Sequence, residues 1–365
     1  MNTPKLSSIQ LLFLVIIFEV GSTTLFALGI GAKQDAWIVI LFAYIVGVLL
    51  LLCYTQIPRY YNQKDFGYIL TDIIGKPFAI VLLFLYSMYF LSQSTHNFYE
   101  FGALIKLTAL PYTPLWFILY AFIFVVIYIL RLGFEVLART VEIFLPFFIF
   151  FNLLIYSFNF FTGELDMSNL LPILGDGIVP ILHQLPTVIA FPFGESVVFL
   201  MLWHYVTYQR DMRKISIIGM TIAAILLLLS IIIIIGVLGP RFASQTDIPF
   251  LEILLSIHVG LIFTNLDSIG VFILFIGGFY KTAIHVYVSS LLLSWIFKKV
   301  SKNTLIVIIG LFLPIISLLR FDNLDDQRWK GVESGVYVIL IYTLIPTLIL
   351  LLLVIKNRKQ RNEQT

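Results

Sequence analysis

Residues 191–195 read Phe191-Pro192-Phe193-Gly194-Glu195, inside an apolar stretch long enough to cross a membrane. A corresponding stretch near the start of the chain is interrupted by Glu19-Val20-Gly21-Ser22-Thr23-Thr24. A helix broken in lipid frees backbone N–H and C=O groups, which are tolerated only where they line a buried cavity. Paired broken helices in two halves of a membrane protein point to a solute site near the midplane. The two stretches therefore predict a transporter-type fold that binds something small and polar.

Composition indicates a polytopic membrane protein. Of the 365 residues, 60% are hydrophobic and 12% are charged, a balance that soluble domains do not have. Because a helix needs about 20 apolar residues to span the bilayer, the pattern predicts one all-α integral-membrane domain over 1–365 with ten transmembrane helices. These helices are expected at 8–30, 35–55, 79–104, 112–130, 141–161, 182–203, 215–238, 268–296, 304–319 and 335–355. Segment 247–259 is too short to cross and is typical of an amphipathic or re-entrant piece.

The distribution of basic residues predicts the orientation. If the N-terminus is cytoplasmic, most of the 23 Lys and Arg residues fall in segments on the cytoplasmic side. This is the bias that membrane proteins show. The even number of spans then places both termini in the cytoplasm.

The third predicted span carries a polar stripe. Tyr89, Gln93, His96 and Glu100 are separated by 4, 3 and 4 residues, and Asn97 lies beside them. This spacing puts the four side chains on one face of a helix. A polar stripe on a membrane helix faces the bundle, where it either bonds to neighbouring helices or lines a cavity, and both readings stay open.

Three charged residues are expected deep in the membrane. Lys281 lies near the middle of the eighth span, where a lysine must reach the interface, pair with a carboxylate or lose its proton. Glu19 and Glu195 are its candidate partners. The pair is either a structural lock between two helices, or Lys281 takes the place that a sodium ion has in ion-coupled relatives. For Gly21, the alternatives are a solute site and a small-residue face for helix packing.

The sequence offers little for other chemistry. It contains no Walker motif, no GxSxG, no HExxH and no Cys/His cluster. Its one cysteine, Cys53, lies in an apolar run and is expected to serve packing. We therefore expect no enzyme activity, no cofactor or metal, and no nucleic-acid partner.

Several short motifs resemble one family, the permease-like B subunits of Gram-positive spore germinant receptors. Leu171-Pro172-Ile173-Leu174-Gly175-Asp176-Gly177 is similar to the stretch that precedes the broken sixth span in that family, and Asp35-Ala36-Trp37-Ile38 resembles its Asp-Gly-Trp start of the second span. Phe193-Gly194-Glu195 and Ile262-Phe263-Thr264-Asn265-Leu266-Asp267 also fit. The chain departs from the family's Gly-x-Gly and proline in the first span, where it has Gly21-Ser22-Thr23 and Leu28.

The resemblance implies a fold, a role and partners. The fold is that of the amino acid–polyamine–organocation superfamily, a LeuT-like 5+5 inverted repeat with broken helices 1 and 6 and approximate repeats at 8–161 and 182–355. The role is sensing a small germinant, commonly an amino acid, a sugar or an inorganic ion. The implied location is the spore inner membrane with both termini on the core side, beside an A subunit and a lipoprotein C subunit.

A specific hypothesis for the site combines these readings. The carboxylate of a zwitterionic ligand would meet backbone N–H groups at the first break, and its amine would meet carbonyls at the second break together with Glu195. The candidate ligand-binding residues are Gly21, Ser22, Thr23, Thr24, Tyr89, Gln93, Asn97, Phe191, Phe193, Gly194 and Glu195, and the coupling or ion-pair residues are Lys281, Glu195 and Glu19. The rivals are a proton-coupled amino-acid symporter, with Lys281 or Glu195 as proton carrier, and an assembly subunit with a vestigial pocket.

Overall fold

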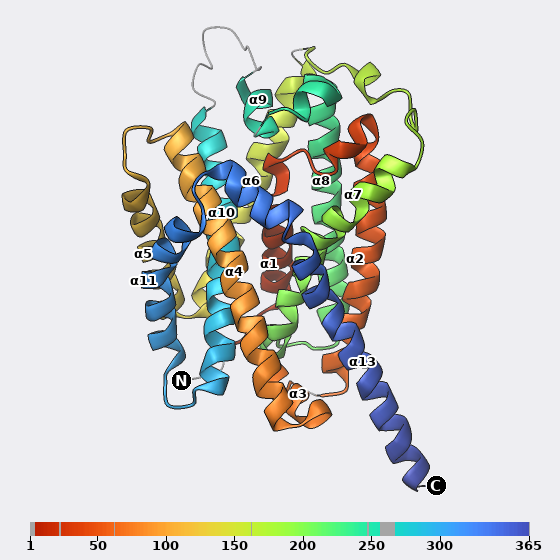
Figure 1. The fold of residues 1–365 in the computed structure, drawn as a ribbon, viewed down its shortest axis with the longest axis vertical. Coiled ribbons are helices and arrows are strands. Elements are labelled where there is room, and N and C mark those ends of the chain that lie inside the picture. Colours follow the sequence, from red (N-terminus) through yellow and green to blue (C-terminus); the bar gives the residue numbers. More distant parts are fainter. Residues whose placement is uncertain are drawn as a thin grey trace.

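The computed structural model describes residues 4–21, 23–61, 63–161, 163–246, 248–255 and 267–364. In these ranges the protein is a bundle of long helices without a β-sheet, and Figure 1 shows both termini at the same end of the bundle. Ten helical segments among the described residues are long and apolar enough to span a membrane. The predicted all-α class and the ten spans are therefore confirmed.

The elements follow the predicted spans closely, with short helices between them. In chain order they are α1 (Ser8–Val20), η1 (Thr23–Leu25), η2 (Ile30–Asp35), α2 (Ala36–Arg59), α3 (Phe66–Ile74), α4 (Lys76–Thr108), α5 (Leu115–Leu132), α6 (Phe134–Phe161), η3 (Met167–Leu170), α7 (Val179–Ala190), η4 (Phe193–Met201), η5 (Trp203–Tyr205), α8 (Met212–Ala243), α9 (Pro249–Leu255), α10 (Asp267–Ile296), α11 (Lys302–Arg320), α12 (Leu324–Arg328), η6 (Trp329–Glu333) and α13 (Val336–Gln364).

Several helices extend beyond the apolar stretches from which they were predicted. α6 begins at Phe134 rather than near 141, and its first turns carry Glu135 and Arg139. Charged residues at the membrane surface lower the local hydropathy, so the apolar stretch ends before the helix does. Glu and Arg are nevertheless good helix formers, and the helix continues through them. The described part of segment 247–259 contains the short helix α9, while Asp247 and residues 256–259 lie outside the described residues.

Both predicted helix breaks are present. α1 ends at Val20 with Gly21 as its C-cap, and the chain continues as the 3-10 turns η1 and η2. α7 ends at Ala190, Phe191 adopts an extended backbone (φ −129°, ψ 119°), and the 3-10 helix η4 follows. Proline at 192 has no N–H to continue the α-helical ladder. Ser22 of the first break lies outside the described residues.

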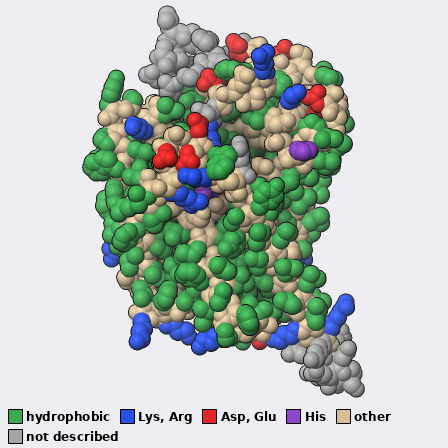
Figure 2. Space-filling model, viewed as in Figure 1, with side chains coloured by type: hydrophobic (Ala, Val, Ile, Leu, Met, Phe, Trp, Pro, Cys, Tyr) green, Lys and Arg blue, Asp and Glu red, His purple; other side chains and the backbone are tan. Residues whose placement is uncertain are grey.

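The broken first helix lies in the middle of the bundle. α1 packs against α8, α6 and α10, and α10 in turn packs along α4 (Figure 1). Figure 2 shows one face covered by hydrophobic side chains at mid-height, with Lys and Arg gathered at the end that holds the termini and most of the visible acidic residues near the other end. This distribution is that of an integral membrane protein.

The end of α13 that projects beyond the bundle is tied to α3. Lys356 Nζ and the Tyr61 hydroxyl each donate to Asp72 Oδ2, at 2.8 and 2.7 Å. These donors, Lys356 first, hold the pKa of the Asp72 carboxyl below its usual range.

Candidate functional site

A cavity of about 400 Å³ lies beside both helix breaks. Its size falls in the range of small-molecule sites. Its walls come from the segment after the first break, from α4, from α7 and the α7–η4 break, from the connection between α8 and α9, from the loop between α11 and α13, and from the start of α13. The polar and aromatic residues on these walls include Phe26, Gln93, His96, Asn97, Glu100, Gln184, Thr187, Phe191, Glu195, Gln327 and Arg328.

Four of the residues predicted to bind ligand line this cavity. Gln93 and Asn97 reach it from α4, and Phe191 and Glu195 reach it from the second break. Asn97 Nδ2 donates to the Gln93 carbonyl at 2.9 Å, which leaves its Oδ1 as an acceptor. The α4 stripe thus lines the cavity with Gln93, His96 and Glu100.

Other predicted residues hold the second break in place and are not part of the lining. Tyr89 stacks on Tyr342 of α13, with ring centroids 4.3 Å apart. Phe193 is fully buried and packs beside Gly47 of α2, where an added Cβ would lie 2.8 Å from the Phe193 Cβ. The Gly194 carbonyl accepts from Thr343 Oγ1 at 3.3 Å.

Two backbone carbonyls at the first break accept hydrogen bonds from hydroxyl groups of the protein itself. Thr23 Oγ1 donates to the Glu19 carbonyl at 2.6 Å, and the Thr24 carbonyl accepts from Ser230 Oγ at 3.0 Å. Gly21 lies against Gly277 of α10, so closely that a Cβ at Gly21 would be 2.8 Å from the Gly277 carbonyl oxygen. The cavity is lined instead by the following segment, 26–30.

Lys281 pairs with Glu195 rather than with Glu19. Its Nζ lies 2.6 Å from Glu195 Oε2, and both side chains are at most 2% exposed. The contact is an ion pair. Gln93 Nε2 donates to the other carboxylate oxygen, Oε1, at 2.8 Å. Lys281 Nζ also lies 3.9 Å from the centroid of the Phe191 ring, a cation–π distance.

Glu19 is fully buried and is the second-last residue of α1, two residues before Gly21. Within the described residues, neither of its carboxylate oxygens has a hydrogen-bond partner. Both candidate carboxylates therefore lie in the bundle interior, but only Glu195 meets the lysine.

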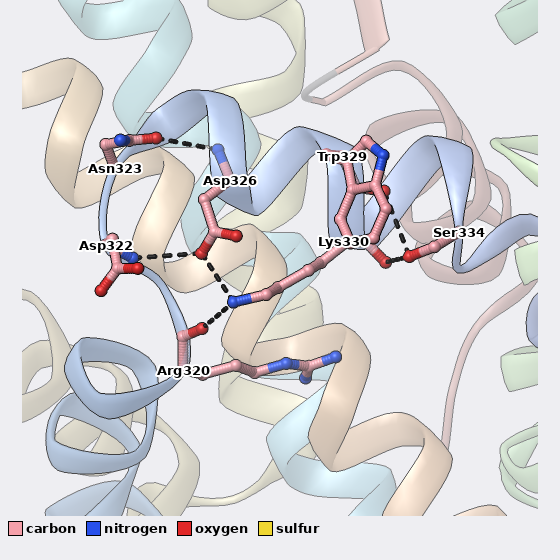
Figure 3. Close-up of polar contacts among 7 residues, drawn as sticks. All are labelled: Arg320, Asp322, Asn323, Asp326, Trp329, Lys330 and Ser334. Carbon is pink, nitrogen blue, oxygen red and sulfur yellow. Dashed lines mark hydrogen bonds and ion pairs between the residues drawn. The ribbon is translucent and has the colours of Figure 1, made fainter.

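The loop between α11 and α13 covers one side of the cavity and is pinned in two ways. Figure 3 shows Lys330 Nζ between Asp326 Oδ2 and the Arg320 carbonyl, each at 2.7 Å. The Arg320 guanidinium donates to α4, at 2.8 Å to Ser92 Oγ and 2.7 Å to Thr95 Oγ1. Gln327 and Arg328, in the same loop, are part of the lining.

This loop supplies the site residues that the sequence reasoning missed. Gln327 and Arg328 lie about 230 residues after the α4 stripe that they face, and Gln327 Nε2 donates to the His96 carbonyl at 3.2 Å. The charged run from Arg320 to Asp326 was noticeable in the sequence. Its folding back over the cavity follows from tertiary contacts, which no local pattern encodes.

We expect Arg320→Gln to loosen this cover, because the substitution removes the donor that joins the loop to Ser92 and Thr95. A cysteine placed in the cavity wall at Ala27, in a Cys53→Ser background, should then react several-fold faster with a hydrophilic maleimide. Arg241→Gln, at an exposed position near the end of α8, is the matched control. Equal labelling rates in the two variants would contradict the role of Arg320 in holding the loop over the cavity.

The fold and the cavity define a class of membrane protein. Broken helices around a small solute-sized cavity are the architecture of LeuT-type permeases. Residues 5–325 match the family model described as spore germination protein, and the chain belongs to this family. The family and the fold are those of a membrane permease or receptor, not of an enzyme.

Three relatives span most of the chain. It is 29% identical to spore germination protein KB of Bacillus subtilis (strain 168) over 100% of this chain and 98% of the relative. It is 25% identical to spore germination protein YndE of the same organism over 99% of each chain. It is 24% identical to spore germination protein A2 of that organism over 89% of this chain and 87% of the relative.

Two solved structures share the fold. One is MhsT in complex with L-phenylalanine, with a TM-score of 0.67 and 13% identity, covering 96% of this chain and 89% of MhsT. The other is Mhp1, a nucleobase-cation-symport-1 family transporter in a closed conformation with bromovinylhydantoin bound. Its TM-score is 0.68 at 12% identity, and the match covers 95% of this chain and 78% of Mhp1. The predicted LeuT-like fold is confirmed by this likeness.

Proposed function

We propose that this chain is the solute-binding B-type subunit of a spore nutrient germinant receptor. One observation carries the proposal: a cavity of about 400 Å³ beside two broken helices, in a chain of the spore germination family. Its lining combines apolar and aromatic surface with a few polar and charged groups, as small-solute sites do. The ligand is a small polar germinant, and an amino acid fits this lining best.

Signalling requires two arrangements of the same bundle. A ligand that binds one arrangement better shifts the population toward it. The broken segments and the loop between α11 and α13 are the parts that enclose the ligand, so they differ between the two arrangements. An A subunit and a lipoprotein C subunit read the change in the spore inner membrane, and the basic end with both termini faces the spore core. The two halves, 8–161 and 182–355, form inverted repeats of one domain.

Asn97→Leu tests the assignment of the cavity. Leucine has a similar size but removes the amide oxygen that Asn97 presents to the cavity. In spores whose only receptor contains this chain, we expect the effective concentration of the triggering amino acid to rise about tenfold. The measurement is a germination dose–response curve, with the level of each subunit checked by immunoblot. An unchanged curve at normal protein level would place the ligand elsewhere.

The second candidate is a proton-coupled amino-acid symporter. The buried Lys281–Glu195 pair beside the cavity favours it, because intramembrane ionisable pairs can serve as proton relays. Uptake of a radiolabelled amino acid into vesicles under an imposed proton gradient separates the two. Gradient-driven accumulation supports the symporter, whereas a germination response without accumulation supports the receptor.

A further inference from the structure

Two of the short family motifs, those that contain Asp35 and Leu174, bind each other beside the cavity. Asp35 ends η2, and Leu174 lies in the loop 171–177 that precedes α7. Asp35 is 2% exposed, and its Oδ1 accepts from the Leu174 N–H at 2.9 Å. Asp35 is also the N-cap residue of α2, yet its side chain caps no N–H of that helix. Its carboxylate therefore joins two segments instead of ending a helix.

The conformation of this loop fits the same contact. Leu174 has a φ of +56°, in the left-handed region that costs free energy for a residue with a Cβ. Such a conformation persists where the surrounding structure determines it. The Leu174 carbonyl accepts from the Gly177 N–H at 2.9 Å, so the backbone of Leu174 is held at both its N–H and its C=O. Gln34 Nε2 adds a hydrogen bond to the Pro172 carbonyl at 3.2 Å.

The two joined segments lead directly into two walls of the cavity. Residues 26–30, just before and at the start of η2, line it after the first break, whereas Gln184 and Thr187 line it from α7, just before the second break. α7 packs along both η2 and α2 (Figure 1). A Cβ at Gly31 of η2 would lie 2.6 Å from Gln184 Cδ, so glycine permits a close approach here. The two walls thus meet where η2 crosses α7.

We propose that Asp35 is a positioning residue: through Leu174 it holds the segment after the first break to the start of α7, so that the two cavity walls move as one unit. This inference rests on the proposed function, because it states how two walls of that solute site are coupled. Separating them would leave a buried carboxylate without its hydrogen bond, which is costly. A ligand that draws in one wall therefore draws in the other, and the response becomes a single change between two arrangements.

Cysteine labelling of the purified full-length chain in nanodiscs tests this Asp35–Leu174 strap without a ligand. In a Cys53→Ser background, a cysteine at Ala27 reports on the wall after the first break, and a cysteine at Thr187 reports on the α7 wall. Asp35→Ala removes the acceptor, so a hydrophilic maleimide should react about tenfold faster at both positions, the factor expected for one hydrogen bond to a charged group. Asp35→Asn keeps an acceptor oxygen and should label slowly at both positions.

The controls change similar groups that do not join the walls. Asp211→Ala removes an exposed aspartate from the N-cap of α8, which also makes no side-chain cap bond, and Lys33→Met removes only the exposed ion pair of the same loop. Both should label at close to the wild-type rate. The native Cys53, in chains without an introduced cysteine, reports on general loosening and should react equally with and without Asp35→Ala. If Asp35→Ala does not reach the membrane, Gln34→Leu removes the second bond to the loop and should raise both rates by a smaller factor.

The strap is overturned if Asp35→Ala leaves both labelling rates at the wild-type value, or raises one and not the other. It is also overturned if Asp35→Asn labels as fast as Asp35→Ala, because the acceptor would then not be what holds the walls. The solute site is decided separately by the Asn97→Leu dose–response curve. A strap that passes its test beside an unchanged Asn97→Leu curve keeps the coupling of the two walls and removes the proposed function.

Discussion

Lys281→Met should remove most of this protein from the membrane. Lys281 and Glu195 form an ion pair with an Nζ–Oε2 distance of 2.6 Å and with side chains at most 2% exposed. Breaking a buried pair by removing one partner leaves an uncompensated charge and costs about 3–5 kcal/mol. Methionine fills much of the lysine volume, so the effect reports lost charge compensation rather than a cavity. The measurement is the amount of protein in the membrane fraction, together with the midpoint of thermal unfolding in detergent.

Two further variants identify the cause. The double variant Lys281→Met/Glu195→Gln has no buried charge at the pair and keeps an acceptor for the Gln93 amide, so its level should return toward wild type. Lys33→Met breaks the exposed ion pair Lys33–Asp176, which has an Nζ–Oδ2 distance of 2.8 Å and side chains that are 62% and 49% exposed. This substitution should lower the free energy of unfolding by at most about 1 kcal/mol. A double variant no more stable than Lys281→Met would contradict the charge explanation. A double variant at normal level that no longer responds to ligand would give Lys281 a role in coupling as well.

The helix breaks could be predicted because their causes are local. Pro192 and Gly194 disrupt a helix wherever they occur, and the apolar residues around them place the disruption inside the membrane. The α4 stripe could be predicted for the same kind of reason, since the spacing of Gln93, His96 and Glu100 determines the face that they share. The structure confirms both breaks and puts this stripe on the cavity wall.

The choice among partners could not be predicted. Glu19 and Glu195 are equally plausible partners for Lys281 by depth, and the rotation of α1 and η4 about their axes decides between them. Arg328 joins the cavity because α12 docks onto α4 through Gln327. These outcomes depend on contacts between segments far apart in the chain, and periodicity says nothing about them. The role of Gly21 is of the same kind, because a small residue suits both a solute site and a close helix crossing.

Gly277→Ala should destabilise the bundle at the first helix break. A Cβ at Gly277 would overlap the carbonyl group of Gly21 and lie 2.9 Å from the Gly21 Cα. These are backbone atoms, which cannot move aside as the end of a side chain can. α1 and α10 must therefore separate where α1 breaks, and we expect a loss of about 2–3 kcal/mol in the free energy of unfolding, near the upper end for overpacking. Thermal unfolding in detergent measures the loss.

Gly270 provides a matched control on the same helix, seven residues and about two turns earlier. Among the described residues, the three atoms nearest to a Cβ at Gly270 belong to the Leu254 and Leu251 side chains, at 3.6–3.9 Å, which is ordinary contact. Since alanine also favours the helix by about 1 kcal/mol over glycine, Gly270→Ala should be neutral or stabilising. If the two alanine variants unfold at the same temperature, the close crossing of α1 and α10 does not hold the break. If Gly277→Ala is destabilised and the reciprocal Gly21→Ala is destabilised as well, packing against α10 is sufficient to explain a glycine at the first break.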